Sequence, residues 1–143
     1  MNSREFFFEY CNTINSINAK YDEYARKFNV VSSNLFWLLY ALNDGKQHRQ
    51  LDLCEHCCLP KSTINTIIKD LEKKGYVILT KGEDKRERLV SYTISGKEYA
   101  DSILNDLFSK EDNVFNENKD ELMDLIKNLR RFNELLVSLE SDE

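Results

Sequence analysis

The sequence predicts a mainly α-helical fold with one small β-hairpin, which places it in the α+β class. Apolar residues recur at helical spacing through residues 64–71, and two short β-branched and aromatic runs follow on either side of a charged stretch. In the helical stretch the apolar residues stand at i, i+3, i+4 and i+7, so one face is expected to pack into a core. They are Ile64, Ile67, Ile68 and Leu71.

The two runs are expected to form strands over residues 76–80 and 89–93, joined by the charged residues 82–88. Gly75 is expected to end the preceding helix, because glycine readily adopts the left-handed conformation found at many helix ends. Lys73 and Lys74 come just before it and suit the negative end of the helix dipole. The order helix, strand, charged turn, strand and helix is that of a winged helix-turn-helix.

Two shorter helices are expected before this unit. The first covers residues 32–43, with Ser32 or Ser33 as its N-cap. Its inward stripe is expected to consist of Leu35, Leu38, Leu39 and Leu42. The second covers residues 50–59 and braces the following helix across a phosphate backbone. Its core-facing residues are expected to be Leu51, Cys54, Cys57 and Cys58.

Both ends of the chain predict long amphipathic helices. The N-terminal stripe contains Phe7, Tyr10, Cys11, Ile14, Ile17, Tyr21, Tyr24 and Phe28. The C-terminal stripe contains Leu122, Leu125, Ile126, Leu129, Phe132, Leu135, Leu136 and Leu139. Each stripe is too long for one small core to cover. The two helices either pack on each other within a monomer or cover one another across a two-fold axis.

Length and charge restrict the classes of protein to consider. A chain of 143 residues is expected to form a single domain over residues 1–143. The net charge of −5 is unevenly distributed, because residues 45–97 carry eleven basic and seven acidic side chains, whereas residues 98–143 carry five and thirteen. A basic middle segment can face a polyanion even when the whole chain is acidic.

Other classes lack a sequence signal. The N-terminal residues show no signal-peptide pattern and no stretch has the length of a membrane span, so a cytoplasmic protein with reduced cysteines and no membrane partner is expected. There is no glycine-rich phosphate loop and no nucleophile elbow, and neither histidine stands in a recognisable acid–base arrangement. The sequence therefore predicts no enzyme, no cofactor and no metal site.

Four short motifs closely resemble the core of the multiple antibiotic resistance regulator (MarR) family. They are the Leu-turn-Ser-Thr helix start at residues 59–64, Leu-Glu-Lys-Lys-Gly-Tyr-Val at 71–77, the Asp-x-Arg wing at 84–86, and, at 92–96, the segment that corresponds to the family's Leu-Thr-x-x-Gly. The Asp-x-Arg wing is the most specific of them. The match departs at Tyr92, where the family more often has leucine.

The resemblance implies a DNA-binding transcriptional regulator that acts as a homodimer on a palindromic duplex, in most cases a repressor released by a small molecule. Residues 1–30 and 97–143 would be dimerisation helices, and residues 32–96 would be the DNA-binding region. Arg86 would enter the minor groove, with Asp84 holding the wing by pairing with Arg88 or with Arg86 itself. The residues expected to contact DNA are Lys61, Ser62, Thr63, Asn65, Thr66, Lys69, Lys73, Asp84, Lys85, Arg86 and Arg88.

These residue types suit the two tasks of a DNA reader. Small hydroxyl and amide side chains hydrogen-bond to base edges in the major groove, whereas lysine and arginine neutralise phosphates. The resemblance also implies a cleft for a small aromatic effector, lined by Phe36, Trp37 and Tyr40, with Phe8 or Tyr24 from the first helix.

Three alternatives stay open at this point. Cys54, Cys57 and Cys58 share a helical face and could bind a soft metal or sense oxidants, although three small buried side chains pack equally well in a core. Cys11, with tyrosines nearby, could sense peroxides. A winged helix can also act as a protein-interaction module without DNA contacts, but such a module has no need of a row of hydroxyl and amide groups beside a basic wing.

Overall fold

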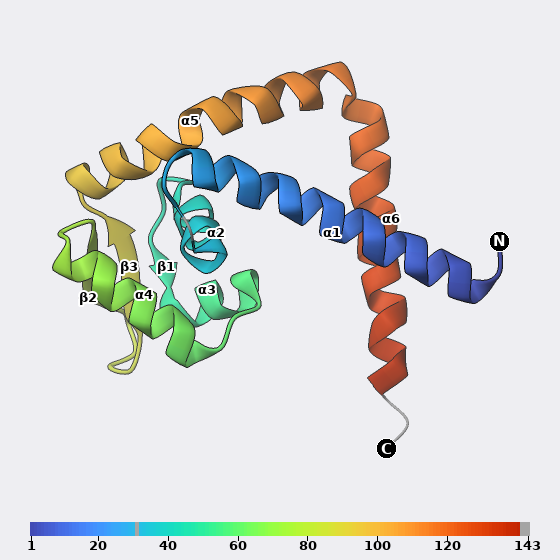
Figure 1. Cartoon of the computed structure of the whole chain (residues 1–143). Coiled ribbons are helices and arrows are strands. Elements are labelled where there is room, and N and C mark those ends of the chain that lie inside the picture. Colours follow the sequence, from blue (N-terminus) through green and yellow to red (C-terminus); the bar gives the residue numbers. More distant parts are fainter. Residues whose placement is uncertain (31, 141–143) are drawn as a thin grey trace. The chain divides into compact units, whose positions relative to one another are not determined.

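The computed structural model describes residues 1–30 and 32–140 and confirms the predicted fold class, a mainly helical chain with a small antiparallel sheet (Figure 1). Its elements in chain order are α1 (Ser3–Lys27), α2 (Ser33–Leu42), β1 (His48–Arg49), α3 (Gln50–Cys57), α4 (Lys61–Lys73), β2 (Val77–Lys81), β3 (Arg88–Tyr92), α5 (Ile94–Glu117), α6 (Lys119–Val137) and a 3-10 turn (Ser138–Glu140). The chain forms two compact units, residues 1–104 and 105–143, and α5 runs from the first into the second.

The first unit contains a hydrophobic core built from α2, α3, α4, the sheet and the first half of α5. On α4, Ile64, Ile68 and Leu71 are buried as predicted, and Ile67 is half-buried. The other core residues are Ala25, Val30, Phe36, Leu38, Leu39, Leu42, Leu53, Cys54, Val77, Val90, Ala100, Ile103 and Leu104. Burying this apolar surface is the main source of stability for the unit.

Two inward faces differ from the prediction. On α2, Phe36 is fully buried, whereas the predicted Leu35 is only half-buried. On α3, Leu53 is buried with Cys54, whereas the predicted Leu51 is 57% exposed and Cys58 is exposed. A helix of eight residues contains about two turns, which are too few for sequence spacing to decide which face turns inward.

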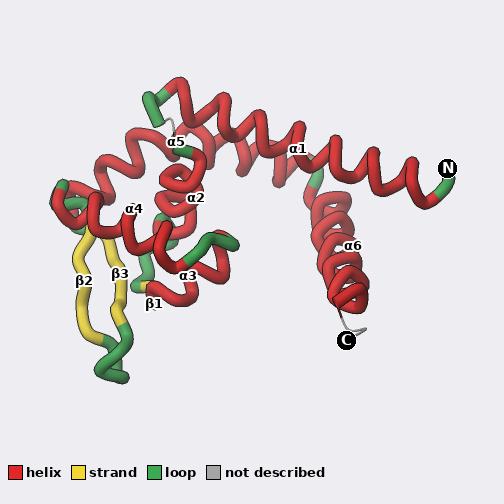
Figure 2. Tube along the Cα trace, turned by 60° about the horizontal axis from the view of Figure 1, so that its bottom comes forward, coloured by secondary structure: helices red, strands yellow, loops and turns green. Residues whose placement is uncertain are grey.

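The sheet has three strands in the order β1-β3-β2, all antiparallel. The hairpin pairs Val77 with Tyr92 at its base and Lys81 with Arg88 next to the turn, so both strands are offset by one residue from the prediction. Figure 2 shows β2 and β3 running together to a turn that forms the wing. The sequence did not predict β1, because its two residues show no strand pattern of their own and depend on pairing with Leu89 and Val90.

The ends of α1, α2 and α4 are capped by the residue types expected at helix termini. Asn2 and Glu5 form a capping box at the start of α1, and the hydroxyl of Ser32 caps α2 by accepting from the Leu35 N–H at 3.2 Å. Gly75 ends α4 at φ +74°, which confirms the predicted end of this helix. The N–H groups of Gly75 and Tyr76 each donate at 2.9 Å to carbonyls of the last turn, the Schellman arrangement.

The start of α5 is fastened to the end of α4. Thr93 donates through its hydroxyl to the Gly75 carbonyl at 2.5 Å, and Ser95 donates to the same oxygen at 3.0 Å. Gly96 lies so close to the Tyr76 carbonyl that a Cβ at this position would overlap the oxygen. Tyr99 stacks on the Tyr76 ring at a centroid distance of 4.5 Å. The start of α5 thus fixes the C-terminal end of α4.

Tyr92, the one departure from the family motif, has a structural role. Its hydroxyl donates to the Leu39 carbonyl in the last turn of α2 at 2.8 Å. Burial raises the pKa of the Tyr92 phenol, so it stays a neutral donor. The larger side chain therefore links the end of β3 to α2, a link that leucine cannot make.

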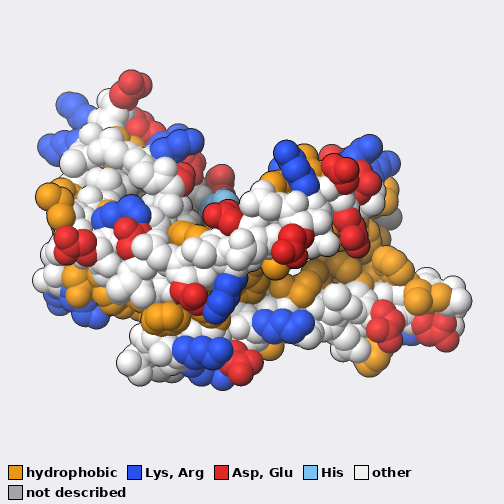
Figure 3. Space-filling view, turned by 90° about the horizontal axis from the view of Figure 1, so that it is seen from above, with side chains coloured by type: hydrophobic (Ala, Val, Ile, Leu, Met, Phe, Trp, Pro, Cys, Tyr) orange, Lys and Arg blue, Asp and Glu red, His pale blue; other side chains and the backbone are white. Residues whose placement is uncertain are grey.

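Both terminal helices carry exposed apolar side chains. On α1, Phe6, Phe7 and Phe8 are 46%, 44% and 64% exposed. The second unit has no buried residue on α6, where Leu125 and Leu135 are each 50% exposed. Figure 3 shows hydrophobic side chains reaching the surface among charged ones. In the part of the chain that is described, no helix is long and apolar enough to cross a membrane.

Candidate nucleic-acid interface

The N-terminal turns of α3 and α4 and the turn of the wing enclose a groove of about 800 Å³. The residues that line it are Arg49, Gln50, Leu51, Lys61, Ser62, Asn65, Asp84, Arg86, Glu87 and Arg88. Six of these ten are among the residues predicted from the sequence to contact DNA, and they come from two separate segments, residues 61–65 and 84–88. The fold therefore brings these six residues together on one side of the first unit, whereas the other five predicted residues do not line the groove. Those five are Thr63, Thr66, Lys69, Lys73 and Lys85.

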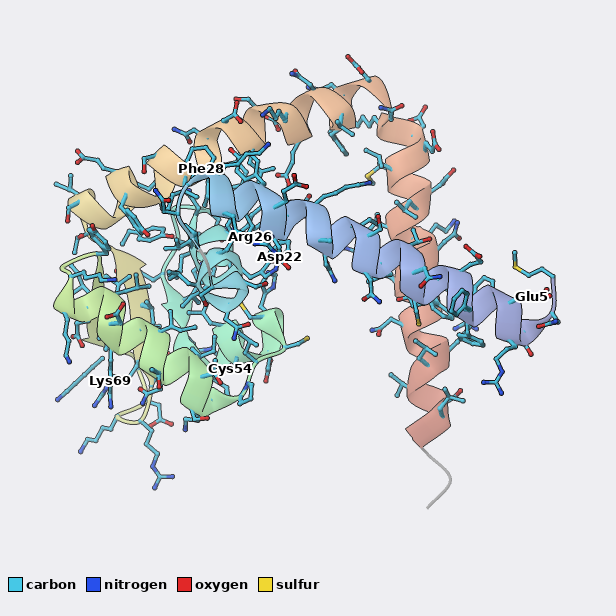
Figure 4. All side chains as sticks on the ribbon, in the orientation of Figure 1. Glu5, Asp22, Arg26, Phe28, Cys54 and Lys69 are labelled. Carbon is cyan, nitrogen blue, oxygen red and sulfur yellow. The ribbon has the colours of Figure 1, made fainter. Side chains whose placement is uncertain are left out.

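On α4, the predicted reading residues lie on the face opposite the buried isoleucines. Ser62 and Thr66 are exposed, whereas Thr63 and Asn65 are half-buried. The lysines Lys61, Lys69 and Lys73 are exposed, and Figure 4 labels Lys69 on the outer side of α4.

Two hydrogen bonds restrict the reading side chains. Thr66 donates its hydroxyl to the Ser62 carbonyl at 3.0 Å, so its oxygen is left as an acceptor. Gln50 donates through its amide to Asn65 Oδ1 at 3.5 Å, which leaves the Asn65 amide N–H groups to donate elsewhere. The N-cap residue of α4, Pro60, offers no side-chain cap, so the first-turn amides and the positive end of the helix dipole favour an anion such as phosphate.

The wing turn is shaped by Asp84. Its carboxylate accepts from the backbone N–H of Arg86 at 3.1 Å, and its carbonyl accepts from the Glu87 N–H at 2.9 Å. The sequence-based expectation that Asp84 pairs with the side chain of Arg86 or Arg88 is therefore corrected to a backbone contact. Lys85, Arg86 and Arg88 are exposed, so their charges face solvent.

Four groove residues were not predicted as site residues, namely Arg49, Gln50, Leu51 and Glu87. Arg49 donates through Nε and one terminal nitrogen to Asp52 at 2.9 and 2.7 Å and through the other terminal nitrogen to Glu87 at 3.2 Å. These residues enter the groove because β1 pairs with β3 and places the start of α3 beside the wing. The sequence carries no local signal for that pairing.

The cysteines lie apart from this groove. Cys54 is buried, Cys57 is half-buried, and Cys58 is exposed and donates to the Glu55 carbonyl at 3.5 Å. Burial raises the pKa of the Cys57 thiol, which disfavours the thiolate that metal binding and oxidation require. Within residues 1–30 and 32–140, no group of three His, Cys, Asp or Glu side chains is arranged to hold a metal ion.

Of the predicted effector residues, Trp37 and Tyr40 belong to a partly exposed cluster of rings in the first unit. Trp37 contacts Tyr40 at a ring-centroid distance of 5.5 Å and Tyr21 of α1 at 5.1 Å. Phe36 touches Trp37 at 5.5 Å but is itself fully buried and belongs to the core. The ring that α1 contributes to the cluster is Tyr21, whereas Phe8 is exposed and Tyr24 contacts Phe28 with tilted rings at a centroid distance of 5.1 Å.

A helix-turn-helix with a basic wing beside the N-terminus of its second helix defines a class of DNA-binding regulators. Residues 33–87 match the model of the MarR family. The HTH-type transcriptional regulator SarZ of Staphylococcus aureus is 32% identical over 131 residues, which cover 91% of this chain and 87% of the relative. The chain belongs to the MarR family, and it is a DNA-binding regulator of transcription and not an enzyme.

Solved structures share the fold. NMB1585, a MarR family regulator from Neisseria meningitidis, is 28% identical, and the two structures align with a TM-score of 0.81 over 99% of each chain. NadR, solved in complex with 4-hydroxyphenylacetate, is 19% identical and aligns with a TM-score of 0.69 over 95% of this chain and 92% of NadR.

Proposed function

We propose that the protein binds a palindromic operator as a homodimer and represses transcription until a small-molecule effector releases it. Residues 32–96 form the reading region in this proposal, and residues 1–30 and 97–143 form the dimerisation helices. The observation that carries the proposal is the groove that joins the N-terminus of α4 to the wing. Its positions suit major-groove reading by the helix and minor-groove contact by the wing.

The test is selection of duplexes from a random-sequence library by the full chain, followed by fluorescence anisotropy on the recovered site. Recovery of a two-fold symmetric site, with half-sites about one helical turn apart, supports the proposal. A reporter gene placed behind the site then distinguishes repression from activation. If no duplex is enriched and anisotropy stays flat at low salt, DNA binding is refuted and the interaction-module alternative takes its place.

Replacing Arg86 with Ala is expected to weaken binding to the selected site by about tenfold or more, because a charged contact in a narrow minor groove is lost. Asp84→Ala is expected to weaken binding less, because it loosens the turn but keeps the arginine. Anisotropy at a fixed salt concentration measures both variants. An unchanged dissociation constant for Arg86→Ala contradicts the assignment of Arg86 to the minor groove.

Substitutions at Asn65 and at Lys73 are expected to impair DNA binding in different ways. Asn65→Ala should reduce the preference for the selected site over random duplex, because a hydrogen bond to a base edge is lost, and by about 1–3 kcal/mol if that contact is bidentate. Lys73→Ala should weaken binding to all duplexes alike and flatten the salt dependence, because it removes a phosphate contact. A salt titration on both duplexes measures the two variants. Equal losses on specific and random DNA for Asn65→Ala contradict this division of roles.

The effector part of the proposal rests on the cluster of Tyr21, Trp37 and Tyr40. NadR, the similar structure with 4-hydroxyphenylacetate, supports an aromatic acid as the class of ligand. Salicylate or 4-hydroxyphenylacetate is expected to change the fluorescence of Trp37 saturably and to weaken DNA binding by a coupling energy of about 1–3 kcal/mol. Trp37 is the sole tryptophan, so its signal needs no assignment.

The same titration has a clear opposing outcome. If a panel of aromatic acids leaves both fluorescence and DNA affinity unchanged, while peroxide or a thiol-reactive metal releases the DNA, the cysteine alternative replaces the aromatic effector. Variants Cys11→Ser and Cys58→Ser then identify the reacting thiol, because both side chains are exposed.

A further inference from the structure

Arg49 occupies the junction between the sheet and the helix-turn-helix. It is the last residue of β1, where it pairs with Leu89 of β3, and it is also the N-cap residue of α3. Its guanidinium binds Asp52 of α3 through two nitrogens and Glu87 of the wing through the third. One side chain therefore links α3 to the wing across 38 residues of sequence.

The geometry of the guanidinium separates Arg49 from the phosphate-binding side chains. All three of its nitrogens already donate to carboxylates, and the fork on Asp52 is bidentate, the arrangement that best fixes an arginine. Two carboxylates facing one guanidinium leave a net charge of −1, which does not attract a phosphate. The two acids also raise the pKa of Arg49, and hydrogen bonding to Arg49 lowers the pKa of Asp52.

Glu87 is the part of the wing that Arg49 holds. Its backbone N–H donates to the Asp84 carbonyl at 2.9 Å, and its own carbonyl accepts from the Gly82 N–H at 3.2 Å. Its side chain lies over Gly82, where an added Cβ would overlap it. Glu87 thus closes the turn that carries Asp84 and Arg86, so displacing Glu87 displaces that turn.

The charge of Glu87 also needs an explanation. An acidic side chain lining a groove for DNA repels phosphate unless a cation neutralises it. Arg49 offsets this charge only in part, because its guanidinium is shared with Asp52, and the Glu87 side chain is 30% exposed. The contact with Arg49 gives Glu87 a structural role in the wing that accounts for an acidic side chain in this groove.

We propose that Arg49 is a positioning residue, which acts through Glu87 to hold the wing so that Arg86 meets the minor groove beside each half-site. The inference rests on the proposed DNA-binding function. It predicts that Arg49 controls how strongly the protein prefers A·T-rich over G·C-rich sequence flanking its site, because a narrow A·T-rich groove favours an inserted arginine.

The test compares the affinity of the full chain for its selected site with A·T-rich and with G·C-rich flanks. Arg49→Met and Glu87→Gln are each expected to lower this ratio by about two- to fivefold, the range for an exposed ion pair. The double variant should lower it no further, since both changes break the same link. As a matched control, Lys81→Met removes one positive charge from the hairpin and should weaken both duplexes equally, with the ratio unchanged.

A second measurement does not depend on DNA. Amide hydrogen exchange of residues 82–88 is expected to quicken in Arg49→Met and not in Lys81→Met, because only the first variant frees the turn. If Arg49→Met fails to fold, Arg49→Lys takes its place, because lysine keeps the charge but cannot make the fork.

Two outcomes overturn the inference. If Arg49→Met weakens both duplexes equally, flattens the salt dependence and leaves the ratio and the exchange unchanged, Arg49 is a phosphate contact. If the unaltered protein selects a site but shows no flank preference, the wing does not read the flanks. Failure of the unaltered protein to enrich any duplex instead refutes the proposed function itself.

Discussion

Replacing Gly96 with Ala is expected to destabilise the first unit by about 3 kcal/mol or more, at the upper end of the cost of overpacking. The added methyl group would overlap the backbone carbonyl of Tyr76, and backbone cannot rotate away as a flexible side chain can. The same carbonyl accepts from the Thr93 N–H at 3.0 Å, so it cannot shift without losing that bond. Urea denaturation followed by circular dichroism measures the loss.

Gly45→Ala is the matched control. Gly45 has φ +74° and nothing within 4 Å of an added Cβ, so alanine there meets backbone strain but no clash. Its cost should be about 1–2 kcal/mol, the penalty for a left-handed alanine. If Gly96→Ala lowers the free energy of unfolding no more than Gly45→Ala does, the close approach of Gly96 to the Tyr76 carbonyl is contradicted.

Replacing both Leu129 and Leu136 with Asp is expected to convert the proposed dimer to monomer and to abolish specific DNA binding. Both leucines lie on α6, which buries none of its own residues, and both are half-buried in the single chain. A family-type dimer interface is expected to bury about 2,000–5,000 Å², and two aspartates within it would lose their hydration without a partner. Affinity for the two-half-site duplex should fall by more than about a hundredfold, because simultaneous binding of both half-sites is lost.

Sedimentation velocity and anisotropy measure this pair of effects. Lys127→Asp serves as the control, because it changes the net charge by the same amount at an exposed position of α6 that is not part of the apolar stripe. It should leave the protein dimeric. An unaltered protein that sediments as a monomer and still binds its site tightly contradicts the two-fold arrangement.

The sequence predicted the parts of the fold that local patterns determine. The stripe on α4 and the stop at Gly75 follow from spacing and from backbone preference, and both are confirmed by the buried Ile64 and Ile68 and by the left-handed Gly75. The polar face of α4 and the charged wing follow from the residue types in these segments. Six of the eleven predicted residues line one groove, and the contacts of all eleven with DNA stay predictions.

The features that the sequence did not predict depend on contacts between distant residues. Strand β1 exists because β3 offers an edge, and the Arg49 link exists because β1 carries that residue to the wing. The inward face of α3 is set by its entry from β1 rather than by its own short pattern, which explains why Leu51 was misplaced. Asp84 was correctly chosen as a wing residue, but its partner is a backbone amide that side-chain reasoning does not reveal.

The double hydrogen bond to the Gly75 carbonyl limits how the reading face can move. Since Thr93 and Ser95 hold that oxygen from α5 and Gly96 seats against the next carbonyl, α4 cannot swivel about its own axis without breaking these contacts. These contacts couple a rotation of α4 to a movement of the first turn of α5. A change in the direction of α5 at Gly96 is therefore expected to move α4, and with it the side chains of Ser62 and Asn65.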